Sequence, residues 1–512
     1  MAPPRENEER SSTPATTIWG RLWSNVRVKG GLWQESSGAL GDVGTFLPIV
    51  LALALVNGLD LGTTLIFTGL YNIITGLLFG VPMPVQPMKS IAAVAIAEGD
   101  PLTVPQIMAA GLSTATVLFL LGVTGLMTAV NRLVPLSVVR GIQLSQGLSF
   151  GSKAIKYIMN EQDFKTAKPI GPRPWVGLDG IILALSALLF VVLVTGAGGG
   201  KPTAEHGSPS DELPEQSDDE DETPDQETGR SEYQQPLLTE GTATTGTMAP
   251  WAKRISLIPS ALIVFLVGVI IAVIRSPDTM KNLQWGPSAF SVVRITWDDW
   301  KIGFFRAAIP QIPLSVLNSV IAVCKLSNDL FPSKQVTPMA VSSSVGLMNL
   351  CGCWFGAMPV CHGAGGLAGQ YRFGARKGLS VVILGSAKLL LGLLLGSSLL
   401  RLLAQFPTGL LGVLLLFSGA ELALACRDQN TRLDAFVMLV VTIVSQGASS
   451  AAYGFVSGLI FYFLVKLHER VVGFLAGKGI ALSTDKSKTS KEDKSKTSKE
   501  ETEIAIHSIV RK

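Results

Sequence analysis

The sequence predicts an all-α polytopic membrane protein with fourteen transmembrane segments in two inverted repeats of seven. Three observations lead to this fold class. Only 16% of the 512 residues are charged and 47% are hydrophobic, whereas a soluble protein carries about a quarter charged residues. Apolar runs of about 18 residues or more, each long enough for a transmembrane helix, follow one another along the chain. Two short, Pro- and Gly-interrupted apolar segments also recur at matching places, one in each half.

The predicted segments of the first half are 37–56, 61–80, 84–97, 104–129, 133–150, 177–195 and 255–274. Those of the second half are 303–324, 337–356, 359–371, 378–400, 407–425, 432–446 and 449–467. The third and tenth are too short to cross a bilayer, which takes about 20 apolar residues, so we expect half-helices there. An odd number of segments per repeat gives the two repeats opposite orientations.

The chain divides into four predicted regions. Residues 1–35 form an N-terminal lead, 36–275 the first repeat, 276–470 the second repeat, and 471–512 a Lys-rich tail without fixed structure. An acidic insert at 196–250 is also predicted to be disordered. Lys and Arg gather in the loops on one side of the predicted topology, which indicates that both termini, the insert and the tail are cytoplasmic.

The two short segments share a pattern. Each follows a Phe-Gly pair, at Phe79 and Phe355, and each then reaches a Pro-Val pair, at Pro84 and Pro359. Interrupted segments at corresponding places in two halves are the best sequence indication of a transporter's binding site. Lys89 follows the first Pro-Val pair, and because a cation in the bilayer costs about 2.5–3.5 kcal/mol, it is expected to face a cavity. The alternative is that Lys89 reaches the membrane interface.

Helix starts add to this charge. The N-terminus of a helix carries unpaired N–H groups and about half a positive charge. Two opposed helix starts together with Lys89 give about +2, which suits a divalent anion. In the second copy the start is Gly363-Ala364-Gly365-Gly366, which leaves those N–H groups bare. Close helix packing is the other explanation for these glycines.

Further polar residues complete the candidate site. Gln311, Ser315 and Asn318 share one helix face, which indicates either a wet lining or hydrogen bonds between helices. Asp42 and Thr45 share a face of the first segment. For Asp42 three roles stay open: proton coupling, a counter-charge to Lys89, or capping of the segment.

Two titratable residues have weaker indications. His362 follows Cys361 in the second short segment and fits either a proton relay or a structural hydrogen bond. Glu421, with Arg427 six residues further on, is predicted to form a packing or gating pair.

No enzyme site is indicated. The chain contains no phosphate-binding loop and no His-Glu-x-x-His motif. Its five cysteines lie in or beside apolar segments and lack metal-site spacing. We therefore predict no catalytic residues, no metal, no cofactor and no nucleic-acid partner.

Three motifs stand out, Gly38–Pro48, Pro84–Ala93 and Cys361–Gly378. Together they resemble the eukaryotic molybdate transporter family, a branch of the sulfate permease superfamily without the C-terminal regulatory domain, and the resemblance extends over about 36–470. It implies a core domain (segments 1–4 and 8–11) that moves against a gate domain (5–7 and 12–14). It also implies a substrate between the starts of segments 3 and 10, against segments 1 and 8.

The resemblance predicts a secondary transporter of molybdate that works by alternating access. The expected substrate-binding residues are Thr45, Gln86, Lys89, Ser90, Gln311, Ser315, Asn318, Cys361, His362, Gly363, Ala364, Gly365 and Gly366, with Asp42 and Glu421 as coupling candidates. Sulfate or a broader set of oxyanions is the alternative substrate, and a non-transporting membrane sensor or scaffold is the alternative class. The lipid bilayer is the expected surrounding, at the plasma or the vacuolar membrane, and a homodimer is a further expectation because dimers are common in the superfamily.

Overall fold

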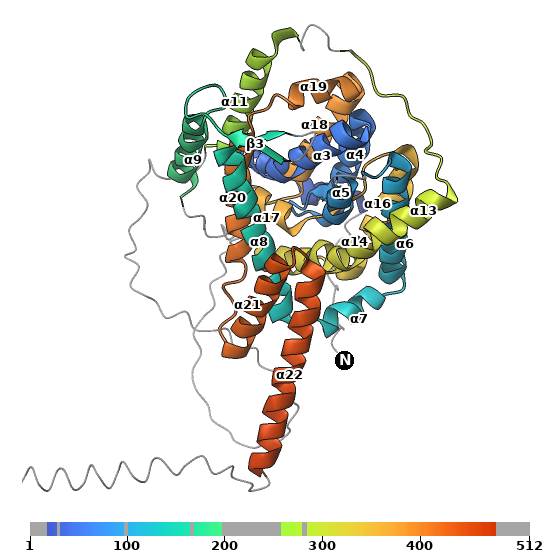
Figure 1. Cartoon of the computed structure of the whole chain (residues 1–512), viewed down its shortest axis with the longest axis vertical. Coiled ribbons are helices and arrows are strands. Elements are labelled where there is room, and N and C mark those ends of the chain that lie inside the picture. The colour runs from blue at the N-terminus through green and yellow to red at the C-terminus, as the bar shows by residue number, and fades with distance from the viewer. Residues whose placement is uncertain are drawn as a thin grey trace, which may run out of the picture. The chain divides into compact units, whose positions relative to one another are not determined.

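The computed structural model describes residues 18–27, 31–96, 101–163, 168–196, 258–278 and 284–477. Helices account for nearly all of the regular structure, and the strands are short (Figure 1). Almost all of the predicted acidic insert, the first half of the N-terminal lead and most of the Lys-rich tail lie outside the described residues.

Two compact units divide the chain. The first consists of the described residues of Met1–Gln86, Gly151–Ser291 and Gly365–Glu421, and the second of those of Pro87–Phe150, Val292–Ala364 and Leu422–Lys512. Each unit draws segments from both predicted repeats. The repeat boundaries themselves stay a prediction. The boundaries between the units fall inside both short segments, after Gln86 and after Ala364.

The first unit contains α1 (Ile18–Val26), α2 (Leu32–Ala39), the 3-10 turn η1 (Leu40–Asp42), α3 (Val43–Asn57), α4 (Leu61–Phe79), most of β1 (Val85–Pro87), the end of α8 (Leu136–Met159), β2 (Asn160–Asp163), β3 (Lys168–Pro172), α9 (Ile181–Thr195), α11 (Ser260–Arg275), most of α17 (Ala364–Arg372), α18 (Leu379–Leu395), η5 (Gly396–Ser398), α19 (Leu399–Leu403) and most of α20 (Thr408–Leu424). Strands β2 and β3 pair antiparallel.

The second unit contains α5 (Lys89–Ala95), α6 (Val104–Val123), α7 (Leu126–Leu133), the start of α8, α13 (Trp297–Gly303), η2 (Phe304–Ala308), α14 (Ile309–Leu314), η3 (Ser315–Ala322), α15 (Val323–Leu330), α16 (Pro338–Gly352), η4 (Cys353–Phe355), β4 (Val360–His362), α21 (Arg432–Gly447) and α22 (Ala451–Gly477).

Six helical stretches of the described residues are long and apolar enough to cross a membrane. They are Leu32–Asn57, Leu61–Phe79, Val104–Val123, Trp297–Leu330, Leu379–Leu403 and Ala451–Phe474, and three shorter apolar helices are α9, α11 and α20. This confirms a multi-pass membrane protein, while the count of fourteen segments stays a prediction. The predicted end of the fifth segment at residue 150 was too early, because α8 continues to Met159.

Local sequence signals fix several helix ends. The carboxylate of Asp60 accepts a hydrogen bond from the Thr63 N–H at 2.6 Å and caps the start of α4. Thr103 and Gln106 form a capping box at the start of α6. Gly80 ends α4 with a φ of 66°, a left-handed conformation that glycine adopts without strain.

Helices α4 and α18 of the first unit lie side by side along an edge of glycines. A Cβ on Gly69 would lie 2.7 Å from the Gly385 carbonyl oxygen, and a Cβ on Gly76 would lie 2.9 Å from the Val382 side chain. Side chains larger than hydrogen would therefore separate the helices. Small residues permit this close approach in membranes, where dispersion contacts replace the hydrophobic effect between helices. The hydrophobic core of the same unit includes Phe406, Leu410 and Leu411.

The stretch from α13 to α15 in the second unit forms one continuous helical path with two π-helical sections, η2 and η3. A π-helical section widens the turn, and such sections occur frequently at functional sites. Of the three residues predicted to share an α-helical face, Gln311 lies in α14, whereas Ser315 and Asn318 both lie in the wider turns of η3.

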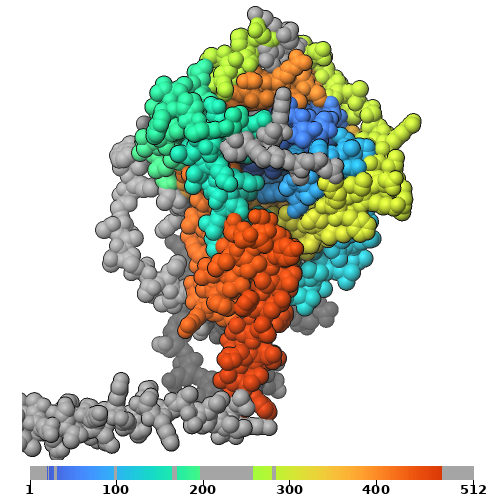
Figure 2. Space-filling view, in the orientation of Figure 1, coloured from blue at the N-terminus to red at the C-terminus, as the bar shows by residue number. Residues whose placement is uncertain are grey.

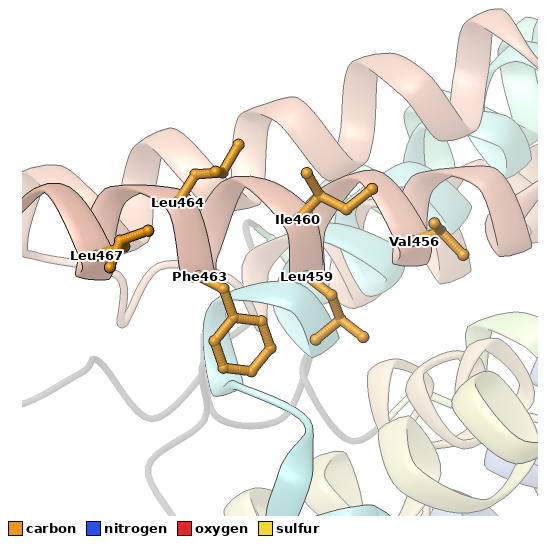
Figure 3. A pocket seen from close by; sticks show the side chains of 6 residues that line it. All are labelled: Val456, Leu459, Ile460, Phe463, Leu464 and Leu467. Carbon is orange, nitrogen blue, oxygen red and sulfur yellow. The ribbon is translucent and has the colours of Figure 1, made fainter.

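Helix α22, at the red end of the colour scale in Figure 2, exposes many large apolar side chains. Only 11% of its apolar window is buried. A shallow groove runs along this helix, lined by Val456, Leu459, Ile460, Phe463, Leu464 and Leu467 (Figure 3). Because these side chains are all apolar, the groove suits lipid chains and not an ion.

Candidate functional site

One polar cluster of the first unit joins the first segment to the end of the extended Pro-Val stretch. Asp42 ends η1, Thr45 lies in the first turn of α3, and Gln86 lies in β1. The Gln86 amide nitrogen donates to the Asp42 carboxylate and to the Thr45 hydroxyl, the latter at 2.8 Å. The Thr45 hydroxyl also contacts the Asp42 carboxylate at 2.5 Å. All three residues are buried.

This arrangement orients the Gln86 amide. An amide nitrogen has two hydrogens, and here one goes to Asp42 and the other to Thr45. In the described part of the chain, the carbonyl oxygen of Gln86 has no hydrogen-bond partner. The structure therefore places Gln86 together with Asp42 and Thr45, with its donors already engaged.

The glycine turn of the second short segment contacts the same cluster. A Cβ on Gly366 would lie 2.6 Å from Pro84 Cγ and 2.9 Å from Asp42 Oδ1, and it would also meet the amide nitrogen of Gln86. Gly366 is thus a glycine because the polar cluster occupies the space of its side chain. Gly365 is buried beside it in α17.

The sequence reading missed a buried cation of this unit. Lys388 is the one charged residue of the predicted segment 378–400, it lies in α18, and only 6% of it is exposed. Its Nζ lies 3.5 Å from the centroid of the Phe46 ring. The signal was available, because a lone Lys inside an apolar run marks function as strongly as Lys89 does.

The second unit holds the other polar cluster, which contains Lys89 at the first position of α5. Lys89 Nζ lies 4.4 Å from the centroid of the Phe150 ring, a cation–π geometry. It also interacts electrostatically with the Cys361 thiol, which in turn hydrogen-bonds Ser319. The start of α5 is tied to the residue before β4, since the Met88 N–H donates to the Pro359 carbonyl at 2.9 Å.

Gln311 occupies the N–H groups at the start of α5. Its side-chain oxygen accepts from the Ser90 N–H at 2.8 Å and from the Ile91 N–H at 3.3 Å. Its amide nitrogen donates to Ser315 Oγ at 2.8 Å. These helix-start donors were predicted to meet the anion, and in the structure a neutral carbonyl oxygen stands there.

The remaining predicted residues of this unit are buried around β4. Asn318 is buried in η3, and His362 ends β4, where its Nε2 lies 3.4 Å from Ser344 Oγ. Gly363 and Ala364 follow directly and are also buried. This contact joins His362 to a side-chain hydroxyl, and both the proton-relay and the structural role of His362 stay predictions.

A pair of asparagines was also missed. In the first unit Asn72 Oδ1 accepts from the Val85 N–H at 2.9 Å. In the second unit Asn349 Oδ1 accepts from the Val360 N–H at 2.7 Å. Each asparagine thus holds the valine of one Pro-Val pair. The signal in the sequence was an Asn shortly before each Phe-Gly pair.

The coupling candidate Glu421 lies 4.0 Å from Arg372 in the first unit, a partner that the sequence reading did not identify. In the second unit Arg140 is buried between two carboxylates, at 2.6 Å from Asp329 and with Nε 3.0 Å from Asp428. Partial burial raises the pKa of Asp428, but the hydrogen bonds from Arg140 and Gln429 outweigh it and hold that pKa below its usual range. Among the described residues, no group of three His, Cys, Asp or Glu side chains could hold a metal ion.

Comparison with known proteins gives the family. A family model described as "Molybdate transporter of MFS superfamily" matches residues 34–150 and 303–422. Molybdate transporter 2 of Arabidopsis thaliana is 55% identical over 474 residues, which cover 92% of this chain and 95% of that protein. The chain belongs to the molybdate transporter family. Molybdate transporter 1 of Arabidopsis thaliana is 52% identical, over 89% of this chain and 93% of that protein. This family consists of transporters, so the chain is not an enzyme.

Similar solved structures support the predicted fold of this chain. A structure of SLC26A9 covers 87% of this chain and 67% of its own, with a TM-score of 0.50 and 16% identity. The murine Solute Carrier 26 family member A9 anion transporter, in the inward-facing state, covers 91% of this chain and 74% of its own, with a TM-score of 0.50 and 15% identity. This agrees with the sulfate permease fold that the motifs predicted.

Proposed function

We infer that this chain transports molybdate across a membrane. Relatives named molybdate transporters are 52–55% identical over about nine-tenths of it. The observation in the structure that best supports this inference is the start of α5, where Lys89 precedes two N–H groups, of Ser90 and Ile91, that donate to the neutral side-chain oxygen of Gln311. An oxygen of a tetrahedral oxyanion is a stronger acceptor than a carbonyl oxygen. We propose that molybdate replaces Gln311 at these two N–H groups.

Charge favours that exchange. Two unit charges 4 Å apart attract by about 4 kcal/mol at an effective dielectric constant of 20. A dianion near Lys89 Nζ gains an attraction of this order for each of its charges, while a neutral side chain gains none. Gln311 can then keep its amide hydrogen bond to Ser315 or turn its amide toward the anion.

The finer parts of the mechanism are proposals as well. We propose fourteen segments in two inverted repeats, with α5 and α17 as the half-helices and alternating access through movement of a core against a gate domain. The equivalent roles of Asn72 and Asn349 support the repeat, because each holds the extended stretch before a short helix. The two copies of the short segment are unequal in sequence, since one carries the cation Lys89 and the other carries the glycines 363, 365 and 366.

Uptake of labelled molybdate in cells without a molybdate transporter tests the proposed function. The expected result is uptake by the wild type and a loss of roughly tenfold or more in Lys89→Ala. Lys466→Ala is the matched control, because Lys466 pairs with Glu469 on the exposed end of α22 and such surface pairs contribute little. Undiminished uptake by Lys89→Ala would remove Lys89 from the mechanism, and absence of uptake by the wild type would refute the proposed function.

Sulfate is the second candidate substrate, because it is also a tetrahedral dianion and the charge of the site does not separate the two. Excess unlabelled sulfate in the same uptake assay decides between them. We expect weak competition, and strong competition would favour a general oxyanion carrier. A pH step across the same membrane tests coupling to protons through Asp42, and a fluorescent fusion distinguishes the plasma from the vacuolar membrane.

A further inference from the structure

The aromatic ring of Phe150 faces the cation at the start of α5. Lys89 Nζ lies 4.4 Å from the centroid of the Phe150 ring. A cation over a ring face, within about 6 Å of the centroid, is attracted by the negative charge of that face. Only 6% of Phe150 is exposed, and the attraction is stronger where water is excluded. The ring is therefore a partner of the Lys89 ammonium inside the second unit.

Helix α8 holds the ring in this place. Gln143 and Phe150 stand seven residues apart in α8, so both lie on one face of the helix. The Gln143 side-chain nitrogen donates to the Ala322 carbonyl at 2.9 Å, and its side-chain oxygen accepts from Arg140 at 2.9 Å. Because Ala322 ends η3, this face of α8 is tied to the helical path that also carries Gln311.

The backbone around Lys89 is held as well. The Met88 N–H before it donates to the Pro359 carbonyl, and the Ser90 N–H after it donates to Gln311. These bonds fix the backbone of Lys89, whereas a lysine carries its charge at the end of a long, flexible side chain. A contact at the ammonium itself is therefore what directs the charge and the N–H donors toward one anion.

An aromatic ring suits this task better than a carboxylate does. A carboxylate beside the ammonium would attract it but would also repel a dianion, since like charges in a low dielectric repel strongly. The ring attracts through its quadrupole and carries no net charge. An ammonium on a ring face keeps its full charge, and those of its three N–H groups that point away from the ring can still donate to an oxyanion.

We propose that Phe150 is a positioning residue for molybdate binding, which holds the Lys89 ammonium over the face of its ring and leaves the positive charge available to the anion. This inference rests on the proposed function, because it concerns the affinity of the same cation for the substrate. Phe150 acts through Lys89, and direct contact with molybdate is not required.

Fluorination of the ring at residue 150 tests this role. Each fluorine withdraws electron density from the ring face and weakens its attraction for a cation, while the shape of the ring changes little. Stop-codon suppression places phenylalanine with one, two or three fluorine atoms at residue 150 of the full-length protein. Equilibrium binding of labelled molybdate to the purified protein is the measurement. We expect the affinity to fall with each fluorine, to about a tenth of the wild-type value with three.

The same series at Phe119 is the matched control. Phe119 lies in α6 of the same unit and is half-buried against Gly346 of α16. Among the described residues, none of the cation–π contacts involves Phe119. We expect this series to bind molybdate within about twofold of the wild type, because its ring stabilises no cation. A role of Phe150 in packing alone would give the same flat result at both positions.

The proposal is overturned if the affinity stays constant across the Phe150 series. It is equally overturned if the affinity rises with fluorination, since the ring would then compete with the anion for Lys89. Phe150→Leu removes the ring but keeps an apolar side chain, and we expect it to bind molybdate about tenfold more weakly or worse; binding like the wild type would contradict the proposal.

Folding failure also leaves a decision. If Phe150→Leu does not fold, the fluorinated series still decides, because it preserves the size of the ring. Failure of the wild type to bind molybdate would instead refute the proposed function, whereas a flat Phe150 series with a binding wild type leaves that function standing.

Discussion

Gly366→Ala tests whether the cluster of Asp42, Thr45 and Gln86 sets the affinity of the site. The new Cβ would lie 2.6 Å from Pro84 Cγ and 2.9 Å from Asp42 Oδ1. Carbon atoms in contact stand at about 3.5–4.0 Å, so the surroundings must move by about 1 Å. Gln86 is the mobile member of the set, and its displacement would break its hydrogen bonds to Asp42 and Thr45.

The size of the effect follows from this overlap. Adding a methyl group to a filled core costs about 1–3 kcal/mol. If the methyl group destabilises only the molybdate-bound state, through the shifted Gln86, the affinity falls by roughly 5- to 150-fold, at 1.4 kcal/mol for each factor of ten. If it destabilises the folded protein with and without molybdate equally, the melting temperature falls instead and the affinity of the folded fraction is unchanged.

Thermal unfolding with and without molybdate separates these two outcomes. Gly151→Ala is the control, because Gly151 lies inside α8 and a Cβ there meets nothing within 4 Å. Alanine in place of glycine in a helix interior stabilises by about 1 kcal/mol, so the control should melt no lower than the wild type. A Gly366→Ala protein that melts and binds molybdate like the wild type would refute the reasoning.

Three further predictions concern other contacts. Gln311→Glu places a carboxylate on the first N–H groups of α5, where it competes with the substrate, and we expect uptake to fall by roughly a hundredfold; uptake within about twofold of wild type would contradict this. Asn349→Ala leaves the buried Val360 N–H without its acceptor and should lower the unfolding free energy by about 1–3 kcal/mol, measured by thermal melts. The pKa of Asp428 is lower in the folded protein than its usual value. Its pairing with Arg140 therefore stabilises the fold at pH values above the pKa of the unfolded state, and this stabilisation is lost as the pH falls through the pKa of the folded state. Melting temperatures between pH 7 and pH 3 should therefore fall less for Asp428→Asn than for the wild type, and equal falls would contradict the assignment.

The helices could be predicted because an apolar run in the sequence by itself indicates a segment that is buried or in contact with lipid. The predicted segment 61–80 corresponds to α4 at Leu61–Phe79, since Asp60 and Gly80 mark its two ends in the sequence. The extended strands β1 and β4 begin at the valines of the two Pro-Val pairs, Val85 and Val360, while the half-helices after them stay a prediction.

The contacts of the candidate site could not be predicted in the same way. The hydrogen bond from the Gln86 amide to Asp42 joins two residues about 40 positions apart in the sequence. The hydrogen bond from the Ser90 N–H to Gln311, at the start of α5, joins residues more than 200 positions apart. Lys388 could have been found as a lone charge in an apolar run, but its contact with the Phe46 ring depends on the packing of α18, which no local pattern reports.

The two asparagines Asn72 and Asn349 fix the backbone of the Pro-Val pairs, and the candidate binding residues lie elsewhere in the same segments. Each holds the valine N–H of a Pro-Val pair, whereas Lys89 and Gly366 lie four to six residues further on. Substitutions after the valine leave the asparagine's hydrogen bond in place. A protein built in this way can acquire a new preference among anions by point mutation without first redesigning its scaffold, so ion selectivity should evolve, and be engineered, more readily than the fold itself.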